Sequence, residues 1–167
     1  MRILGLDLST KRVGFADVDG NTFSITTAYG ADENPRRLST MASQIERRIR
    51  THPPLPDLVV IEGYSLNSPG RIALVRLGEI GGVVRCRLHE LDVPFMEVPP
   101  ASLKRHATGN GNADKDRMFD RARELGSSAR NHDEADAWLL RRMARMAHGL
   151  EQATLPHELD AIASLTW

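Results

Sequence analysis

Residues 3–16 read ILGLDLSTKRVGFA, and this stretch decides the fold. Two short apolar runs, 3–6 and 13–16, predict two neighbouring strands that share a core. The first run leads straight into Asp7. A buried carboxylate is costly unless it is paired or bound to a metal. Asp7 therefore either lies at an open strand end or is held there by another group.

The Asp19-Gly20 pair that follows is a hairpin turn signal, because glycine tolerates a positive φ. Three strands, over about 2–8, 13–18 and 21–28, are therefore expected to form an antiparallel meander. The later elements that periodicity and helix breakers predict are, in chain order, a helix over 35–51, a strand over 58–61, a helix over 69–91, a strand over 94–98, a mobile polar loop within 99–113, and helices over 113–125 and 131–148.

The wholly apolar 58–61 segment indicates a strand buried on both faces, as in a parallel pair. The expected fold class is therefore α/β, with a five-stranded mixed sheet of three antiparallel strands followed by two parallel ones, covered by helices on both faces. The length of 167 residues favours one domain. We place this domain at 1–150 and expect 151–167 to be a C-terminal tail or short helix.

The composition excludes several classes of protein. The 22 basic and 22 acidic residues give zero net charge, which argues against coating nucleic acid by bulk charge but leaves room for local basic sites. No apolar run approaches the roughly 20 residues that span a bilayer. We therefore expect a cytoplasmic protein without membrane association. Cys86 is the only cysteine, so it forms no intrachain disulfide or cysteine-based zinc site, and we expect it to be buried.

Four carboxylates occupy positions that suit one site at a sheet edge. Asp7 and Glu62 end two strands that we expect to be parallel neighbours, and strand ends collect functional sites in such sheets. Asp133 and Asp136 lie three residues apart and so share one helix face. Clustered carboxylates repel one another unless a cation neutralises them, and a pair of Mg²⁺ ions in such a site supports phosphodiester hydrolysis.

Most of these carboxylates also have a purely structural explanation. A strand-end Asp7 or Glu62 can begin a turn by bonding to the backbone. Asp133 is favourable in the first turn of any helix because of the helix dipole. Asp136 lies next to the apolar face and is harder to explain in this way. Glu134 lies off the shared face and is assigned to helix capping.

Four segments in order resemble the RuvC-type Holliday-junction resolvases of the RNase H-like (retroviral-integrase) superfamily: ILGLDLSTKRVGFADVDG, LVVIEGY, SLKRHATGNGNADKDRM and DEADAWLL. The resemblance spans about residues 1–147. It implies an RNase H-like fold and a DNA endonuclease with two Mg²⁺ ions per site, for which Mn²⁺ can substitute. It implies that the catalytic metal ligands are Asp7, Glu62, Asp133 and Asp136, and that Lys104 and Lys115 lie near the scissile phosphate.

The resemblance also implies the partners. Branched DNA is the expected substrate, with four-way junctions first and flaps or forks as further candidates. A junction has two-fold symmetry, so a homodimer is expected, and the glycine-containing 69–91 helix is the candidate interface. The Leu8-Ser9-Thr10 turn replaces the Pro-Gly that the bacterial enzymes usually carry. This departure indicates a divergent, phage-type member, acting in a bacterial or phage-infected cell.

Six residues are candidates for contacting DNA. Tyr64 follows the strand that ends at Glu62, where it could stack on an unpaired base or pack on its own loop. Arg71 and Arg76 could meet phosphates or form the solvent side of their helix. The other three candidates are Lys104, Arg105 and Lys115.

Three rival functions remain open from the sequence. The GLDLSTKRVGFA segment is also similar to the RuvX/YqgF proteins linked to RNA processing, although IEGY before a long glycine-containing helix favours the resolvase type. A sugar-kinase or actin-like ATPase also starts with such a hairpin but needs a second domain, for which this chain is too short. A protein that binds branched DNA without cutting it would be expected if an acidic position were lost.

Overall fold

Five strands form one sheet in the order β3-β2-β1-β4-β5. The computed structural model describes every residue except 31–32, 52, 65–70 and 166–167. β1, β2 and β3 are antiparallel, whereas β4 is parallel to β1 and β5 is parallel to β4, which confirms the predicted mixed sheet. The strands are β1 (Ile3–Leu8), β2 (Arg12–Ala16), β3 (Thr22–Thr26), β4 (Leu58–Glu62) and β5 (Phe95–Val98).

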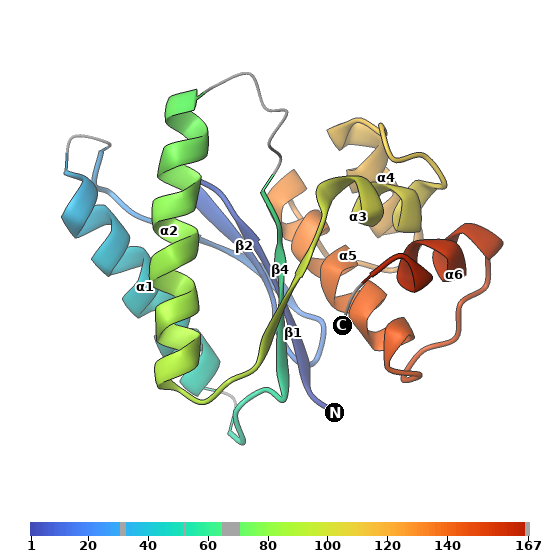
Figure 1. Cartoon of the computed structure of the whole chain (residues 1–167), viewed down its shortest axis with the longest axis horizontal. Coiled ribbons are helices and arrows are strands. Elements are labelled where there is room, and N and C mark those ends of the chain that lie inside the picture. The colour runs from blue at the N-terminus through green and yellow to red at the C-terminus, as the bar shows by residue number, and fades with distance from the viewer. Residues whose placement is uncertain (31–32, 52, 65–70, 166–167) are drawn as a thin grey trace.

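Helices cover both faces of the sheet, as predicted. α1 and α2 lie on one face, while α5 lies on the other with α3, α4 and α6 around it (Figure 1). The helices are α1 (Asn34–Arg50), α2 (Arg71–Glu90), α3 (Pro100–Thr108), α4 (Lys115–Glu124), α5 (His132–Ala147) and α6 (Pro156–Ala163). Within the described residues, no helix combines the length and the apolar character needed to cross a bilayer.

β1 divides its side chains between two hydrophobic cores, because successive strand residues point to opposite faces. Leu4, Leu6 and Leu8 pack in the core formed with α1 and α2. Ile3 belongs to the core on the α5 side. Asp7 has the same parity as Ile3, so the carboxylate is directed to the α5 face of the sheet.

The sequence did not predict α3, which occupies Pro100–Thr108 and leaves only residues 109–113 of the 99–113 stretch for the expected polar loop. Pro100 occupies the first turn of this helix, where its missing N–H leaves no hydrogen bond unmade. Gly109 ends the helix with a φ of 79°, a conformation that suits glycine. The double proline therefore marks both the end of β5 and the start of a helix.

The predicted burial of Cys86 is also wrong, because the side chain is exposed. α2 carries apolar residues around more of its circumference than it buries, and Ile72 and Val75 are 71% and 63% exposed. At the other end of the chain, α6 packs on α3 and α5 and contributes Ala161 to the core. Its Glu158 forms a buried ion pair with α5.

Candidate active site

The ends of β1 and β4 bring two of the predicted acidic residues together. The parallel register pairs Leu6 with Ile61, so Asp7 and Glu62 follow as neighbours at one edge of the sheet. Asp7 is only 6% exposed, and Glu62 is half-buried. The two carboxyl groups act on each other, and, after burial, the charge of Glu62 contributes to raising the pKa of Asp7. Two neighbouring carboxylates repel each other unless a proton or a cation reduces their charge.

α5 supplies the other two carboxylates because it lies directly against the backbone of the sheet. A Cβ atom at Gly14 would lie 1.9 Å from the carbonyl oxygen of Asp133, and one at Gly5 would lie 2.0 Å from that of Ala137. Only glycine leaves room for so close an approach. The helix therefore carries Asp133 and Asp136 to the end of β1.

The start of α5 is held by a network of hydrogen bonds. The side chain of Asn131 accepts the backbone N–H of Glu134 at 3.1 Å. Oε1 of Glu134 accepts the hydroxyl of Ser24 on β3 at 2.7 Å, and Oε2 accepts the backbone N–H of Arg130 at 3.0 Å. Glu134 therefore caps the helix through the N–H of Arg130, one residue before the N-cap Asn131, and not through the N–H of Asn131 as in the predicted capping box. Its contact with Ser24 also ties the helix that carries Asp133 to the sheet.

One cavity of about 340 Å³ collects the predicted catalytic residues. All four carboxylates and both lysines line it, so the structure brings the six predicted residues together in one cavity. The lining residues are Asp7, Leu8, Ser9, Glu62, Gly63, Leu77, Pro100, Lys104, Lys115, Met118, Asp133 and Asp136.

Lys104 and Lys115 reach this cavity from two short helices. Lys104 is half-buried on α3, and the exposed Lys115 is the first residue of α4. Asp114 caps α4 by accepting the backbone N–H of Arg117 at 2.8 Å, which fixes where the helix begins. Burial raises the pKa of Glu62, and both ammonium groups oppose that rise. The two lysines therefore neutralise part of the acidic charge.

The carboxylates nevertheless carry more negative charge than their surroundings balance. Burial, and then the charges of Glu62, Asp136 and Asp133, raise the pKa of Asp7 well above its usual value. Burial, and then Glu62, raise the pKa of Asp136 to about 7. Oδ1 of Asp136 is buried and has no hydrogen-bond partner among the described residues. These oxygens are therefore suited to bind a further cation.

The donor set fits a hard divalent ion, because it consists of carboxylate oxygens. Across the part of the chain that the structure describes, no three histidine, cysteine, aspartate or glutamate side chains are already arranged to hold a metal ion. Nε of Arg12 lies 3.4 Å from Oδ2 of Asp133. Arg12 therefore occupies one carboxylate oxygen of Asp133 and leaves the other available to a metal ion.

Arg12 and Ser9 are site residues that sequence reasoning missed. Ser9 lines the cavity, and its hydroxyl oxygen accepts the backbone N–H of Arg12 at 3.1 Å. This tight turn between β1 and β2 places Arg12 beside Asp133. The available signal was the polar STKR segment at residues 9–12, which begins two residues after Asp7 and therefore lies near the same end of β1.

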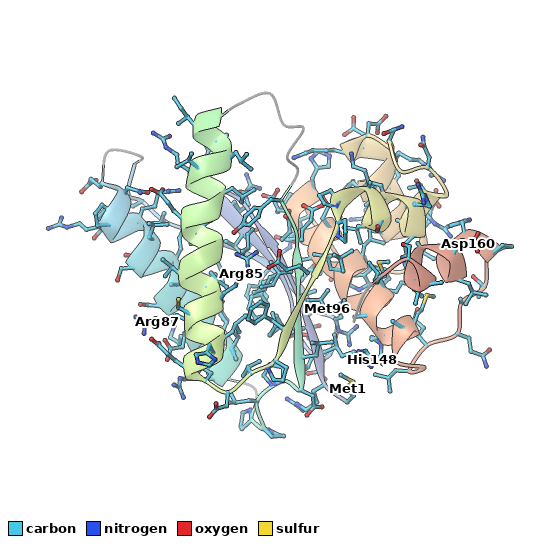
Figure 2. The ribbon with its side chains drawn as sticks, viewed as in Figure 1. Met1, Arg85, Arg87, Met96, His148 and Asp160 are labelled. Atoms are coloured by element: carbon cyan, nitrogen blue, oxygen red, sulfur yellow. The ribbon has the colours of Figure 1, made fainter. Side chains whose placement is uncertain are left out.

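Tyr64 packs against its own chain. Nη1 of Arg85 donates to the tyrosine hydroxyl at 2.5 Å, and the guanidinium lies 4.9 Å from the ring centroid. Arg85 projects from α2 toward the sheet (Figure 2) and pairs with Glu97 of β5 at 2.7 Å. A Cβ atom at Gly81 would lie 2.1 Å from the tyrosine hydroxyl, so this glycine makes room for Tyr64. Base stacking by Tyr64 stays a prediction.

The remaining predicted DNA contacts do not line the carboxylate cavity. Arg105 is exposed on α3, and Arg76 lines a second, separate cavity. The side chain of Arg71 lies outside the described residues. The roles of these arginines stay predictions.

The sheet order, the strand directions and the acidic cavity at the ends of β1 and β4 define a protein of the RNase H-like fold. The profile of the family described as crossover junction endodeoxyribonuclease RuvC matches residues 3–141. The chain therefore belongs to the RuvC family, which confirms the resemblance of its four motifs. This membership favours the resolvase type over the RuvX/YqgF proteins.

Individual relatives agree with the family match. RuvC of Prochlorococcus marinus (strain MIT 9313) is 32% identical over 149 residues, which cover 82% of this chain and 93% of the relative. RuvC of Nocardia farcinica (strain IFM 10152) is 30% identical over 166 residues, covering 88% and 86%. The structure of Thermus thermophilus RuvC has a TM-score of 0.68 at 20% identity, covering 89% of this chain and 96% of that one. This likeness supports the same fold.

Proposed function

We propose that this chain is a metal-dependent endonuclease that resolves four-way DNA junctions by cutting phosphodiester bonds. The observation that carries the proposal is the meeting of Asp7, Glu62, Asp133 and Asp136 in one cavity, in a member of the RuvC family. Relatives at about 30% identity are named crossover junction endodeoxyribonucleases, and a Thermus thermophilus RuvC with a similar fold is described in complex with a Holliday junction substrate.

Metal dependence is a property of the family. We assign the four carboxylates as the residues that hold two Mg²⁺ ions, for which Mn²⁺ can substitute. Bound divalent ions would supply the positive charge that activates a water and stabilises the leaving oxygen. The buried Oδ1 of Asp136, which has no hydrogen-bond partner among the described residues, and the shared cavity of Asp7 and Glu62 support this assignment.

The other side chains of the cavity have separate tasks. Lys104 and Lys115 would contact the scissile phosphate and offset the negative charge that develops on its oxygens as water attacks phosphorus and the phosphodiester bond breaks. Arg12 would hold Asp133 before substrate binds, since it is the described cation nearest to that carboxylate. α5 and β1 keep the carboxylates in place through backbone packing at Gly5 and Gly14.

We further propose that two copies associate through α2, so that two sites face the two-fold symmetric junction. Ile72 and Val75 are largely exposed on this helix, and Gly82 and Cys86, seven and eleven residues after Val75, extend the same exposed stripe. A Cβ atom at Gly78 or Gly82 would contact nothing within 4 Å among the described residues. This leaves a bare surface that another helix could approach. Flaps and forks are further candidate substrates.

Nicking of labelled DNA tests the proposed function. Four-way junctions, flaps, duplex, single strands and RNA would be incubated with Mg²⁺, Mn²⁺ or a chelator. We expect paired nicks on junctions that require metal and that disappear in Asp7→Asn. The matched control is Asp116→Asn, which removes an exposed carboxylate outside the cavity and should leave nicking intact. Absence of cleavage of any DNA or RNA with either metal would overturn the proposal.

A further inference from the structure

A second cavity, of about 310 Å³, lies beyond the carboxylate cavity and is basic. Its described lining contains three cations, Lys11, Arg37 and Arg76, and no carboxylate. The other described lining residues are Thr10, Thr27, Tyr29 and Gly30. A chain of zero net charge thus concentrates positive charge in one concave place. Such a cavity suits an anion rather than a neutral or cationic ligand.

Arg37 distinguishes this cavity from an ordinary basic surface. It is only 3% exposed, yet its hydrogen bonds go to neutral acceptors, the carbonyl oxygen of Thr10 and Oδ1 of Asn34. Its Nε is buried without a hydrogen-bond partner among the described residues. The nearest carboxylate in this network is Glu79, which is reached only through the amide of Asn34.

Arg142, another buried arginine, has its charge balanced within the chain. It pairs with Glu158 at 2.8 Å and with Glu151 at 2.9 Å. Arg141, like Arg37, donates to neutral acceptors, the carbonyl oxygens of Ile3 and Val18. A buried charge without a counter-charge is costly. Arg37 combines the lack of an ion-pair partner among the described residues with a place in the lining of a basic cavity, where an external anion could supply the missing charge.

Two of the cations that line this cavity have no partner among the described residues and could bind a ligand. Lys11 is exposed and Arg76 is half-buried, and neither makes a hydrogen bond or ion pair with any described residue. Lysine and arginine side chains of this kind bind phosphate oxygens by charge-assisted hydrogen bonds. Arg37 lines the same cavity but is buried, so it would add positive charge from a position shielded from water.

A third cavity lies between this cavity and the carboxylate site. It shares Leu8, Ser9 and Leu77 with the carboxylate cavity, and shares Thr10 with the basic one. Thr10 lies three residues after Asp7, so their backbones are at most about 11 Å apart. Successive nucleotides of one strand rise about 3.4 Å along duplex DNA. A DNA strand that follows these three cavities would therefore bring a phosphate about three nucleotides from the cut to the basic one.

We propose that Lys11 and Arg76, backed by Arg37, bind a backbone phosphate of the DNA strand within about three nucleotides of the cleavage site. This inference rests on the proposed function and extends its DNA-binding surface to the β1–β2 turn. The Ser9-Thr10-Lys11 segment then does more than connect β1 to β2, because its residues line the cavities between the carboxylates and the proposed phosphate site. The apolar stretch between them, at Ala73 and Leu74, suits a sugar or base edge.

Binding of a labelled four-way junction in the presence of a chelator, at several salt concentrations, tests this inference. For the double variant Lys11→Gln/Arg76→Gln, we expect affinity to fall about tenfold and the slope of log affinity against log salt to shrink by about 1 to 2. The matched control Arg47→Gln/Arg50→Gln removes two exposed charges from α1, at least about 15 Å further along that helix from Arg37. The control should keep the wild-type slope.

A second measurement locates the phosphate. Single neutral methylphosphonate linkages are placed one to four nucleotides from the cut on either side. One of them should weaken wild-type binding and have no effect on the double variant. Arg37→Gln should reproduce the reduced slope, with thermal unfolding to check that it still folds, because Arg37 also holds the Thr10 carbonyl.

The outcomes separate the two proposals. If the wild type binds and nicks junctions while the double variant keeps the wild-type salt slope, the phosphate site is wrong and the proposed function stands. The same conclusion follows if every methylphosphonate weakens the double variant as much as the wild type. If the wild type neither binds nor nicks junctions, both proposals are overturned.

Discussion

The two faces of the sheet are packed in different ways. On the α5 face, Gly5 and Gly14 let the helix backbone touch the strands. On the α1–α2 face, full side chains such as Leu6 and Phe15 separate the helices from the strands. The first arrangement fixes Asp133 relative to the end of β1, whereas the second mainly buries apolar surface. If the carboxylates act as proposed, their geometry therefore depends on the packing of the α5 face, whereas both faces contribute to stability.

Of the substitutions considered, Gly14→Ala should have the largest effect, because it disturbs the contact between α5 and the sheet. The new Cβ atom would lie 1.9 Å from the Asp133 carbonyl oxygen, so α5 must shift. Overpacking of this kind costs about 1–3 kcal/mol or more of unfolding free energy. A displacement of about 1 Å can cost on the order of 100-fold in rate. Junction nicking and urea unfolding measure the two effects, and wild-type nicking would contradict the role of close packing.

Glu158→Gln probes the buried ion pair on the α5 face. Burial alone would raise the pKa of Glu158, but hydrogen bonds from Arg142 and from the backbone N–H groups of Thr154 and Leu155 lower it from 4.5 to about 2. A lowered folded-state pKa means that stability is fully present above pH 4.5 and is lost as pH falls toward 2. We expect Gln to cost roughly 3 kcal/mol at pH 7.

Urea unfolding of the wild type and Glu158→Gln at pH 7, 4 and 3 checks this expectation. The difference between the two proteins should shrink as the pH falls, because protonation removes the same charge in the wild type. Glu124→Gln is the control, since Glu124 pairs with Arg117 and Arg121 at the surface and should have a much smaller effect. A difference that does not change with pH would contradict the assignment to Glu158.

Ile45→Val tests the opposite face. Ile45 is 2% exposed in the core between the sheet, α1 and α2. Loss of one methylene should cost about 0.5–1.5 kcal/mol of unfolding free energy. Nicking at a temperature well below the unfolding transition should stay at the wild-type rate, because no carboxylate is attached to this core through close backbone contact. If Ile45→Val lowered the nicking rate as much as Gly14→Ala, the two faces of the sheet would not differ in their effect on the carboxylate site.

Gly78→Ala should have the smallest effect and the opposite sign to Gly14→Ala. A Cβ atom at this position of α2 meets nothing within 4 Å among the described residues. Alanine in a helix interior is favoured over glycine by about 0.5–1 kcal/mol. Thermal unfolding at low protein concentration, where copies do not associate, should therefore show stabilisation. Destabilisation there would mean that Gly78 is packed within a single copy.

Much of this architecture was predictable because it depends on local patterns. Apolar runs and the Asp19-Gly20 turn indicated the meander, and the spacing of Asp133 and Asp136 indicated a shared helix face. α3 was missed because a double proline is compatible with both a break and a helix start. Cys86 was misplaced because an apolar helix does not reveal how much of its circumference is covered.

The sequence by itself predicted the strands and their directions from apolar runs and turn signals, indicated the family through the resemblance of four motifs, and marked four carboxylates as candidates for one site. Only the tertiary structure decided how these groups meet. The approach of α5 to Gly5 and Gly14, the contact of Arg12 with Asp133 and the burial of Arg37 join segments far apart in the chain or depend on packing. These contacts depend on how closely segments from different parts of the chain can pack, and no single segment of sequence specifies that.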